Sequence, residues 1–368
     1  MPKSAPKRLY LIPVLSKALD ILELLQSDNR SLSLEAIYEQ TNISKTTVYR
    51  ILKTLVHRGY LAQTQDGLYR IVSRPRKIRF GFGSESSEMP FSVDVTKSLK
   101  AAAASAGVDL LVLDNRYDAT AALENADEFV RQRVDLAIEF QIDEHIAPMI
   151  ADKIHGAGIP LIAVDIPHPH ATFFGVDNYR VGFEAGELLA QHAKSVWGGK
   201  VKWVIGLGIS EAGPLVQSRI SGGFAGIRSK LPNLPEDIFV SLDGEGRTDK
   251  SYRVTRDFLR KHATDRGILI AAATDTSALG ALKAVRELRR ENHVAIAGQD
   301  CIEEALEKMS TPGTPFIGSV SHEASSYGPR LVHIGLSILN GQTVPPYNYV
   351  EHKLITATSI TKRSGAAR

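Results

Sequence analysis

The sequence predicts an α/β protein in which a small module of helices and one β-hairpin precedes a larger, two-lobed body with two parallel sheets and a cleft. Three observations support this class. Residues 10–72 contain three short helical patterns followed by a hairpin signal. From Ile78 onward, short apolar runs alternate with helical patterns about every 25–30 residues, which is typical of βαβ units. A helical stretch from about Tyr179 to Trp197, ended by Gly198-Gly199, separates two series of similar construction.

The composition of the 368-residue chain is that of a folded protein with two or three domains. The single cysteine, Cys301, excludes a disulfide framework and a cysteine-rich metal site, and it suits a reducing compartment. No apolar run approaches the roughly 18 residues that a membrane span needs. The basic N-terminal stretch also lacks the apolar core of a signal peptide. We therefore expect a cytoplasmic protein without a membrane segment.

Charge is distributed unevenly along the chain. Residues 1–80 hold 14 Lys and Arg against 6 Asp and Glu, whereas residues 81–368 hold 30 against 35. A basic first fifth on an acidic remainder indicates a small module that binds a polyanion, of which nucleic acid is the leading candidate. A basic surface that is merely solvated is the alternative on charge alone.

The first two helices of the module are short and follow ordinary start signals. The first pattern places five apolar residues at the spacing of one helix face: Leu15, Ala18, Leu19, Leu22 and Leu25. Ser33 can cap a second helix that ends near Gln40, and Ser44 can cap a third.

The third helix, within SKTTVYRILKTLVHRGY, is the informative one. One stripe is apolar and comprises Val48, Ile51, Leu52, Leu55 and Val56. The residues on the opposite face are polar or basic, and near the N-terminal end of the helix their side chains are short. Such a face suits a helix that enters the DNA major groove, where Lys or Arg read guanine and Thr meets a phosphate or a thymine methyl group.

A hairpin signal completes the module, because Asp66-Gly67 lies between LAQTQ and LYRIV. Three helices and a hairpin make a winged helix-turn-helix. The stretches SKTTVYRILKTL, GYL and LYRI resemble the DNA-binding domain of IclR-type regulators over about residues 9–72. The resemblance implies that the following residues lie at or near DNA, the last two on the wing: Ser44, Lys45, Thr46, Thr47, Tyr49, Arg50, Gln65 and Arg70. A winged helix used only for protein contacts is the alternative.

We expect the winged helix-turn-helix over residues 1–73, a linker over 74–77, the body over 78–360 and a mobile tail over 361–368. In the body, the apolar runs predict nine strands that are covered on both faces. They are expected at 78–83, 109–114, 135–139, 160–165, 201–207, 237–242, 268–273, 293–298 and 316–320.

Polar residues follow several of these strands, where the ligands of open α/β sheets bind. Asp165, Asp275, Asp300 and His322 come at or just after strand ends, and Arg219 opens a helix. The stretches MPFSVDV, PLIAVD, RISGGFAGI, ATDTSALGALKAV, IAGQD and GSVSHEASSYG resemble the type I periplasmic-binding-protein fold, in particular ribose-binding and LacI-type sensor domains. This resemblance spans nearly all of residues 78–360. It implies that Phe91 is an apolar wall of the cleft and that the five polar residues converge on the ligand.

The sequence departs from the ribose-binding pattern at three points. Met89-Pro90-Phe91-Ser92 stands where that pattern has Asn-Pro-Phe-Phe, Ile166 stands where it has Arg, and an aromatic residue near Gly246 is missing. Candidates to replace these contacts are Glu85, His168, His170 and Phe173. Because carboxylates accept paired hydrogen bonds from hydroxyl groups and arginine donates two, sugars or polyols are the expected ligands.

The resemblance also implies how the chain passes between the lobes. We expect crossings near Asn178, after Asp300 and near Gly341, with a helix over 325–340. Lobe 1 would then hold about 78–177 and 300–340, and lobe 2 would hold 178–299 and 341–360. Three crossing segments would form the hinge of a closing cleft.

Cofactor-binding, metal-binding and catalytic sites have weaker support in this sequence than a ligand-binding cleft. GFGSES at 81–86 and GLGISEAG at 206–213 each lack a glycine of the dinucleotide fingerprint, with Ser86 and Glu211 in its place. DIPHPH contains metal-ligand types, but a proline-rich loop explains it as well. Nothing around Cys301 supports thiol catalysis. We expect no cofactor and no metal, and we expect the cleft carboxylates to bind rather than to act as an acid/base pair.

These patterns together predict a ligand-responsive, DNA-binding transcriptional regulator that senses a sugar or polyol and is not an enzyme. Its partners would be double-stranded operator DNA, the small-molecule effector and a second copy in a homodimer or a higher assembly. One alternative is a sugar-processing enzyme or a nucleotide-cofactor-dependent sensor that uses the same cleft. Another is a partner-binding module with a degenerate cleft.

Overall fold

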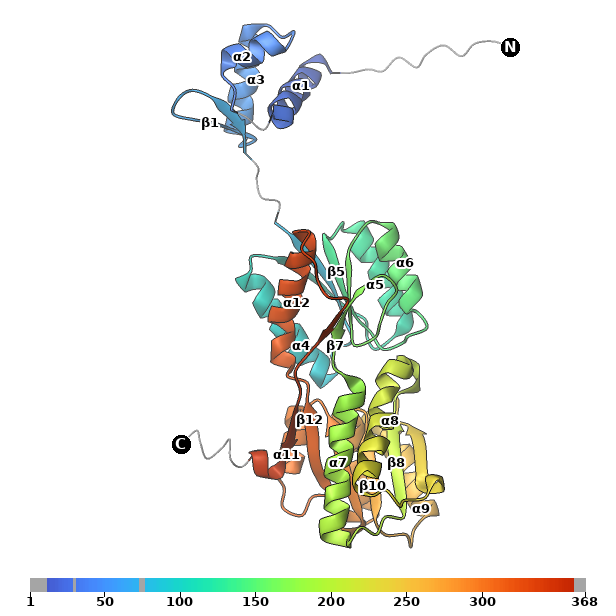
Figure 1. Cartoon of the computed structure of the whole chain (residues 1–368). Coiled ribbons are helices and arrows are strands. Elements are labelled where there is room, and N and C mark those ends of the chain that lie inside the picture. The colour runs from blue at the N-terminus through green and yellow to red at the C-terminus, as the bar shows by residue number, and fades with distance from the viewer. Residues whose placement is uncertain (1–11, 29–30, 73–76, 361–368) are drawn as a thin grey trace, which may run out of the picture. The chain divides into compact units, whose positions relative to one another are not determined.

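The structure is a computed structural model that describes residues 12–28, 31–72 and 77–360 (Figure 1). The chain divides into two compact units, residues 1–77 and 78–368, and each is described by itself. Of the expected linker over 74–77, only Lys77 is among the described residues, and the expected tail over 361–368 lies outside them.

Unit 1 is the expected winged helix-turn-helix. Its elements are α1 (Pro13–Asp28), α2 (Leu34–Gln40), α3 (Lys45–His57), β1 (Leu61–Gln63) and β2 (Tyr69–Ile71). Ser33 caps α2, because its hydroxyl accepts a hydrogen bond from the backbone N–H of Ala36 at 3.1 Å. An isolated bridge joins Leu32 to Tyr69 and ties the start of α2 to the wing.

The buried face of α1 differs from the expected one. Ile21 and Leu25 are buried, whereas Leu15 and Leu19 remain 54% and 48% exposed. The apolar residues of α1 cover more than one face of the helix, and the small core of unit 1 reaches only its second half. The first half of α1 therefore presents apolar side chains at the surface of this unit.

The hairpin loop has three residues rather than the two that Asp66-Gly67 predicts. The N–H of Gly67 donates to the carbonyl of Thr64 at 3.0 Å, and the N–H of Leu68 donates to the Thr64 hydroxyl at 3.1 Å. In this loop only Gly67 has a positive φ, +76°. A type I turn followed by a left-handed glycine is the usual three-residue hairpin, so Gln65 becomes the first residue of the turn.

Unit 2 contains two six-stranded sheets, one in each lobe. The sheet of lobe 1 has the order β13-β7-β6-β5-β3-β4, and all its pairs are parallel. Its strands are β3 (Arg79–Ser84), β4 (Asp109–Asp114), β5 (Leu136–Phe140), β6 (Leu161–Val164), β7 (Thr172–Gly175) and β13 (Tyr347–Tyr349).

The sheet of lobe 2 has the order β14-β12-β11-β10-β8-β9, in which only the β12–β14 pair is antiparallel. Its strands are β8 (Trp203–Gly208), β9 (Phe239–Asp243), β10 (Ile268–Ala272), β11 (Val294–Gln299), β12 (Phe316–Ser321) and β14 (Lys353–Thr356).

Helices cover both faces of each sheet. Lobe 1 has α4 (Pro90–Ser105) and α12 (Ala324–Leu339) on one face and α5 (Ala119–Arg131) and α6 (Ala147–Gly156) on the other (Figure 1). Lobe 2 has α7 (Asn178–Trp197) and α8 (Gly213–Lys230) on one face. Its other face carries α9 (Thr248–Lys261), α10 (Asp275–Glu287) and α11 (Glu303–Met309).

All nine strands expected in the body are present, with ends within two residues of the expected ones. Three further strands, β7, β13 and β14, were not expected. Each has only three or four residues. Strands that short do not show the long apolar run by which a covered strand is detected.

The sheet topology corrects the expected path of the chain between the lobes. β12 pairs with β11, so the chain stays in lobe 2 beyond Asp300 and leaves only after Ser321. It then forms α12 and β13 in lobe 1, where β13 pairs with β7, and crosses back between Tyr349 and Lys353 rather than near Gly341. The first crossing, just before Asn178, is where it was expected.

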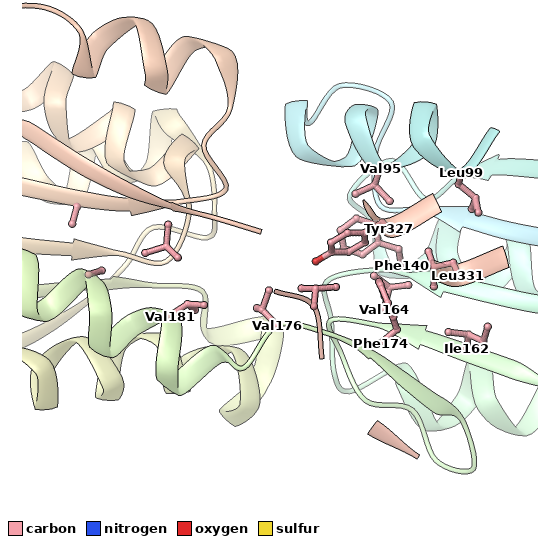
Figure 2. Close-up of a cluster of buried hydrophobic side chains, with 14 of the residues drawn as sticks. Val95, Leu99, Phe140, Ile162, Val164, Phe174, Val176, Val181, Tyr327 and Leu331 are labelled. Carbon is pink, nitrogen blue, oxygen red and sulfur yellow. The ribbon is translucent and has the colours of Figure 1, made fainter. Parts of the chain in front are cut away.

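The core of lobe 1 extends to the crossing between the lobes. Val95 and Leu99 from α4 pack with Phe140, Val164 and Phe174 from the sheet and with Tyr327 and Leu331 from α12 (Figure 2). The Tyr327 ring meets the Phe174 ring edge-on at 5.0 Å between centroids. Figure 2 also shows Val176 at the crossing and Val181 in α7, so the buried cluster continues toward lobe 2.

Candidate ligand cleft and nucleic-acid interface

Close packing of α7 on α8 positions the arginine of the cleft. A Cβ atom at Gly182 would lie 2.0 Å from the Arg219 carbonyl oxygen, and one at Gly222 would lie 2.1 Å from the Tyr179 carbonyl oxygen. Only glycine allows the two backbones to approach this closely. The contact brings Asn178 to Arg219, and the Asn178 Oδ1 atom accepts a hydrogen bond from the guanidinium Nε at 2.5 Å.

Arg219 is buried, with 6% of its surface exposed. Besides the bond to Asn178, its Nη1 atom donates to the carbonyl of Ala273 at 2.9 Å, directly after β10. Two of its donor groups are therefore bound to protein acceptors, and these fix the guanidinium at the strand ends of lobe 2.

Three carboxylates directly follow strands of the two sheets. Glu85 follows β3, Asp165 follows β6 and Asp300 follows β11, and the ends of parallel strands are the usual binding edge of such sheets. Asp165 and Asp300 have positive φ angles of 60° and 105°. Such conformations are costly for residues other than glycine and cluster at functional sites.

These carboxylates and Arg219 line one cavity of about 70 Å³ between the lobes. Its apolar walls include Met89, Phe91, Phe140, Ile166 and Ile209. Its other polar lining residues are Tyr117, Gln141, Thr274 and Thr276.

The charges of the cavity oppose one another. Burial raises the pKa of Glu85 to about 8, helped by the negative charges of Asp165 and Asp300 and opposed by Arg219. Burial also raises the pKa of Asp165 to about 6, although Arg219 acts against this shift. The cavity thus holds carboxyl groups that the protein does not fully compensate.

Two buried polar atoms of the cavity lining lack a hydrogen-bond partner among the described residues. They are Oδ1 of Asp165 and Nε2 of Gln141, in side chains that are 7% and 3% exposed. The hydroxyl of fully buried Tyr327 is a third such atom, and Figure 2 shows its oxygen on the side toward lobe 2. Since buried polar atoms are normally paired, this arrangement is prepared for a polar ligand.

Asp275 does not line the cavity, contrary to the expectation from sequence. It is completely buried, its Oδ1 accepts from the Ser319 hydroxyl at 2.7 Å, and its Oδ2 accepts from the N–H of Ile302 at 3.0 Å. Asp275 is the first residue of α10, so its side chain points back toward β11 and β12. It fastens these elements together instead of meeting a ligand.

His322 also lies behind the cavity rather than on its wall. It is fully buried, and its Nε2 atom pairs with Oε1 of Gln299 at 3.1 Å. Its Nδ1 atom lies 3.2 Å from Oδ1 of Asp300, without the alignment of a hydrogen bond. Burial lowers the pKa of His322, although Asp300 acts to raise it. His322 therefore supports Asp300.

Phe91, by contrast, forms the expected apolar wall. Its ring packs edge-on against Tyr327 at 5.5 Å, His322 at 5.8 Å and Phe140 at 6.4 Å. Of the four candidate replacements for missing contacts, only Glu85 lines the cavity. His168 pairs with the carbonyl of Ile166 in its own loop. Outside the cavity, His170 stacks on His155, and Phe173 packs against Tyr347 with its ring tilted.

Tyr117 is a cleft residue that the sequence reasoning missed. It belongs to lobe 1, and its hydroxyl donates to the carbonyl of Glu245 in lobe 2 at 3.0 Å. The Arg247 guanidinium lies 5.1 Å from the centre of its ring. The backbone N–H of Glu144 also donates across the lobes, to the carbonyl of Glu211 at 3.0 Å. Two hydrogen bonds thus join the lobes across the cleft.

In unit 1, the residues expected at DNA lie on one outer surface of α3 and on the wing. Ser44, Lys45, Thr46, Tyr49, Arg50, Gln65 and Arg70 are exposed, and Thr47 is half-buried. The opposite stripe of α3, with Val48, Ile51 and Leu52, is buried. Lys45 pairs with Glu35 at 2.8 Å on this exposed surface.

Neither a membrane-spanning helix nor a cluster of metal-ligand side chains occurs in the part of the chain that the structure describes. No helix there is long and apolar enough to cross a membrane. No group of three or more His, Cys, Asp or Glu side chains there could hold a metal ion.

The fold and the cleft define a two-lobed binding protein that carries a winged helix-turn-helix. Residues 80–343 match the family model of the periplasmic binding protein domain, and residues 14–65 match that of the IclR helix-turn-helix domain. The chain belongs to the periplasmic binding protein domain family and has an IclR-type helix-turn-helix at its N-terminal side.

Solved structures with the same fold include several sugar-binding proteins. A solute-binding protein of Agrobacterium vitis with bound α-D-tagatopyranose is 16% identical, with a TM-score of 0.70 over 79% of this chain and 98% of that one. One from Bacillus halodurans with bound myo-inositol is 20% identical, with a TM-score of 0.66 over 80% and 99%. A sugar-transporter subunit of Rhodobacter sphaeroides is 22% identical, with a TM-score of 0.65 over 76% and 98%. No curated protein matches the chain.

Proposed function

We propose that the protein is a ligand-responsive, DNA-binding transcriptional regulator whose cleft binds a sugar or polyol. One observation carries this proposal. A cavity between the lobes lined by Asp165, Asp300 and Arg219, with the Asp165 Oδ1 atom unpartnered, occurs in the same chain as an IclR helix-turn-helix domain.

The cavity chemistry supports a polyhydroxylated ligand. Carboxylates accept hydrogen bonds from hydroxyl groups, the unpartnered amide of Gln141 can donate one, and the Phe91 ring offers an apolar face to a sugar ring. Similar folds hold tagatose and myo-inositol. The cleft carboxylates act here as hydrogen-bond acceptors, and the protein is not an enzyme.

The DNA interface of the proposal is the outer face of α3, with the wing beside it. Lys45 and Arg50 contact base edges or phosphates of the major groove, and Gln65 and Arg70 contact the backbone at the wing. This role places the protein in the cytoplasm, together with its operator.

The regulator acts as a homodimer, or as a higher assembly of such dimers. Ile12, directly before α1, and the exposed apolar residues Val14, Leu15 and Leu19 of α1 offer a surface in unit 1 that a second copy can cover. Closure of the cleft then changes the spacing of two DNA-binding modules without altering a base contact.

The full chain is tested both for ligand binding and for DNA binding. Sugars and polyols that bind the cleft raise the melting temperature, and Arg219→Ala abolishes the shift. Duplex DNA selected from a random pool binds the wild-type protein, and Arg50→Ala weakens this binding about tenfold or more. Lys100→Ala, at an exposed lysine of α4, is the control and leaves DNA binding unchanged. A protein that selects no DNA sequence and responds to no sugar or polyol contradicts the proposal.

A further inference from the structure

We infer that the cleft selects a monosaccharide-sized polyol that carries an amino group, and that it rejects sugar acids and sugar phosphates. This inference rests on the proposed function of the cleft as a sugar or polyol site, and it names the chemical class of the ligand.

The inventory of charged groups on the cavity wall is unbalanced. Glu85, Asp165 and Asp300 line the cavity, whereas Arg219 is the one cationic side chain among its described lining residues. The wall therefore holds more carboxylates than cations. An anionic ligand would add a further negative charge to a buried, low-dielectric site, which is strongly unfavourable.

Part of the Arg219 guanidinium is already bound by the protein. Recognition of a carboxylate or phosphate by arginine uses two parallel N–H donors of the guanidinium. Here Nε donates to Asn178 and Nη1 donates to the carbonyl of Ala273. Two of its five N–H groups are thus used by the protein, and no second cation among the described residues lines the wall to help hold an anion.

The carboxylates, by contrast, have free acceptor capacity. Oδ1 of Asp165 is buried without a hydrogen-bond partner among the described residues, and Asp165 lines the cavity. Gln141, 3% exposed, adds an unpartnered Nε2 atom on the same wall. These unpaired atoms are independent of the charge count, and they show that the site is built to receive polar groups.

Asp300 accepts no hydrogen bond from the His322 ring behind it. His322 uses Nε2 to donate to Oε1 of Gln299, so its neutral ring presents the Nδ1 lone pair to the Asp300 carboxylate 3.2 Å away. A ligand ammonium, which is donor-only, supplies the missing positive charge and up to three N–H groups to acceptors that are carboxylates.

The size of the cavity limits the ligand to one sugar ring. About 70 Å³ corresponds to roughly five to seven water-sized positions. Hydrogen bonds from Tyr117 to Glu245 and from Glu144 to Glu211 also hold the lobes close together, which favours a ligand of monosaccharide size over a longer one.

The experiment uses matched carbohydrate sets with the full chain near neutral pH. Calorimetry compares D-glucosamine, D-galactosamine and D-mannosamine with D-glucose, D-galactose and D-mannose and with their 6-phosphates, and myo-inositol and its amino derivative form a further pair. We expect at least one amino compound to bind about tenfold or more tightly than its neutral parent, because an ionised hydrogen bond is roughly twice as strong as a neutral one. We expect the phosphates not to bind.

The other outcomes are distinguishable. If neutral parents bind as tightly as the amino compounds, or if a phosphate binds, the inference fails while the proposed function stands. If none of these compounds binds, and a wider panel of neutral sugars and polyols gives no thermal shift, both fail.

A pair of variants tests the cause. Burial holds the Glu85 carboxyl largely protonated near neutral pH, with a pKa of about 8, and a ligand ammonium beside it favours its ionised form. Glu85→Gln cannot ionise, so we expect the ratio of amino to neutral affinity to fall several-fold. Glu88→Gln removes an exposed carboxylate three residues away and is expected to leave the ratio unchanged. An unchanged ratio in Glu85→Gln would overturn the assignment, and the melting curves of both variants show that they fold.

Discussion

Asp165 and Asp275 are both buried aspartates at strand ends, and the protein treats them in opposite ways. Asp275, in lobe 2, has both oxygens bonded to protein donors, Ser319 and Ile302. Asp165, in lobe 1, lines the cavity with Oδ1 unpartnered. A buried carboxylate that the protein satisfies stabilises the fold, whereas one that it leaves unpaired costs stability and is available to a ligand. Hydrogen-bond pairing, rather than burial, therefore separates structural from functional acids in this unit.

The largest effect is expected from replacing Asp275, whose two carboxylate oxygens both accept hydrogen bonds from the protein. Asp275→Ala leaves the Ile302 N–H and the Ser319 hydroxyl buried without an acceptor, and we expect a loss of about 2–4 kcal/mol in the free energy of unfolding. Denaturant unfolding of the full chain measures this. Asp275→Asn keeps one acceptor oxygen and should lose less. A stable Asp275→Ala protein that no longer binds sugar would reverse the comparison and restore Asp275 as a ligand contact.

The second largest effect is expected from disturbing the close contact between α7 and α8, which positions Arg219. Gly222→Ala places a methyl group where the Tyr179 carbonyl oxygen stands, and α7 and α8 must separate. We expect about 1–3 kcal/mol of destabilisation together with weaker ligand binding, because Arg219 moves with α8. Ser221→Ala, at the exposed neighbouring position, is the matched control for both the denaturant curve and the binding isotherm. Wild-type stability of Gly222→Ala would mean that the helices do not rely on this close approach.

Asp165→Asn should behave in the opposite way to Asp275→Ala. Asparagine fits the left-handed backbone at φ 60°, and removal of an uncompensated charge relieves the fold. We expect the free energy of unfolding to change by less than about 1 kcal/mol, while ligand affinity falls about tenfold or more. Calorimetry with the tightest compound of the matched sets, together with denaturant unfolding, separates the two effects. A large loss of stability with unchanged binding would place Asp165 among the structural acids.

The sequence predicted much of the fold because apolar periodicity is a local property. The nine covered strands of the body and the three helices of unit 1 were all recognisable. Sheet neighbours are not local, so the sequence placed the chain after Asp300 in lobe 1, whereas pairing of β12 with β11 keeps it in lobe 2.

The same limit applies to the site. Asp300 and Asp275 both follow an apolar strand, but Asp300 has a φ of 105° and lines the cavity, whereas Asp275 begins α10 and turns inward. The Thr-Asp-Thr-Ser stretch could have signalled this, because Thr274 caps α10 and an acid in the first turn is common in helices. Tyr117 could not have been found, since its role depends on a contact with the other lobe.

The smallest effect is expected for Glu139, a buried carboxyl that is intermediate between the fully bonded Asp275 and the partly unpaired Asp165. It is 1% exposed, it accepts one hydrogen bond from Asn115 at 2.6 Å, and it is not part of the cavity wall. Burial raises its pKa to about 8, against the opposing effect of Asn115. A carboxyl whose pKa is raised on folding favours the folded state below its unfolded pKa, and this contribution is lost as the pH rises through the folded value.

We therefore expect the melting temperature of the wild-type protein to fall as the pH rises from about 5 to about 8.5. Glu139→Gln has no charge to bury, so its melting temperature should fall less over this pH range. The corresponding difference in the free energy of unfolding is on the order of 1 kcal/mol. Glu124→Gln, at an exposed glutamate of α5, should leave the pH dependence unchanged. Equal slopes in Glu139→Gln and wild type would show that Glu139 stays ionised in the fold, and that one amide donor is enough to satisfy a buried carboxylate here.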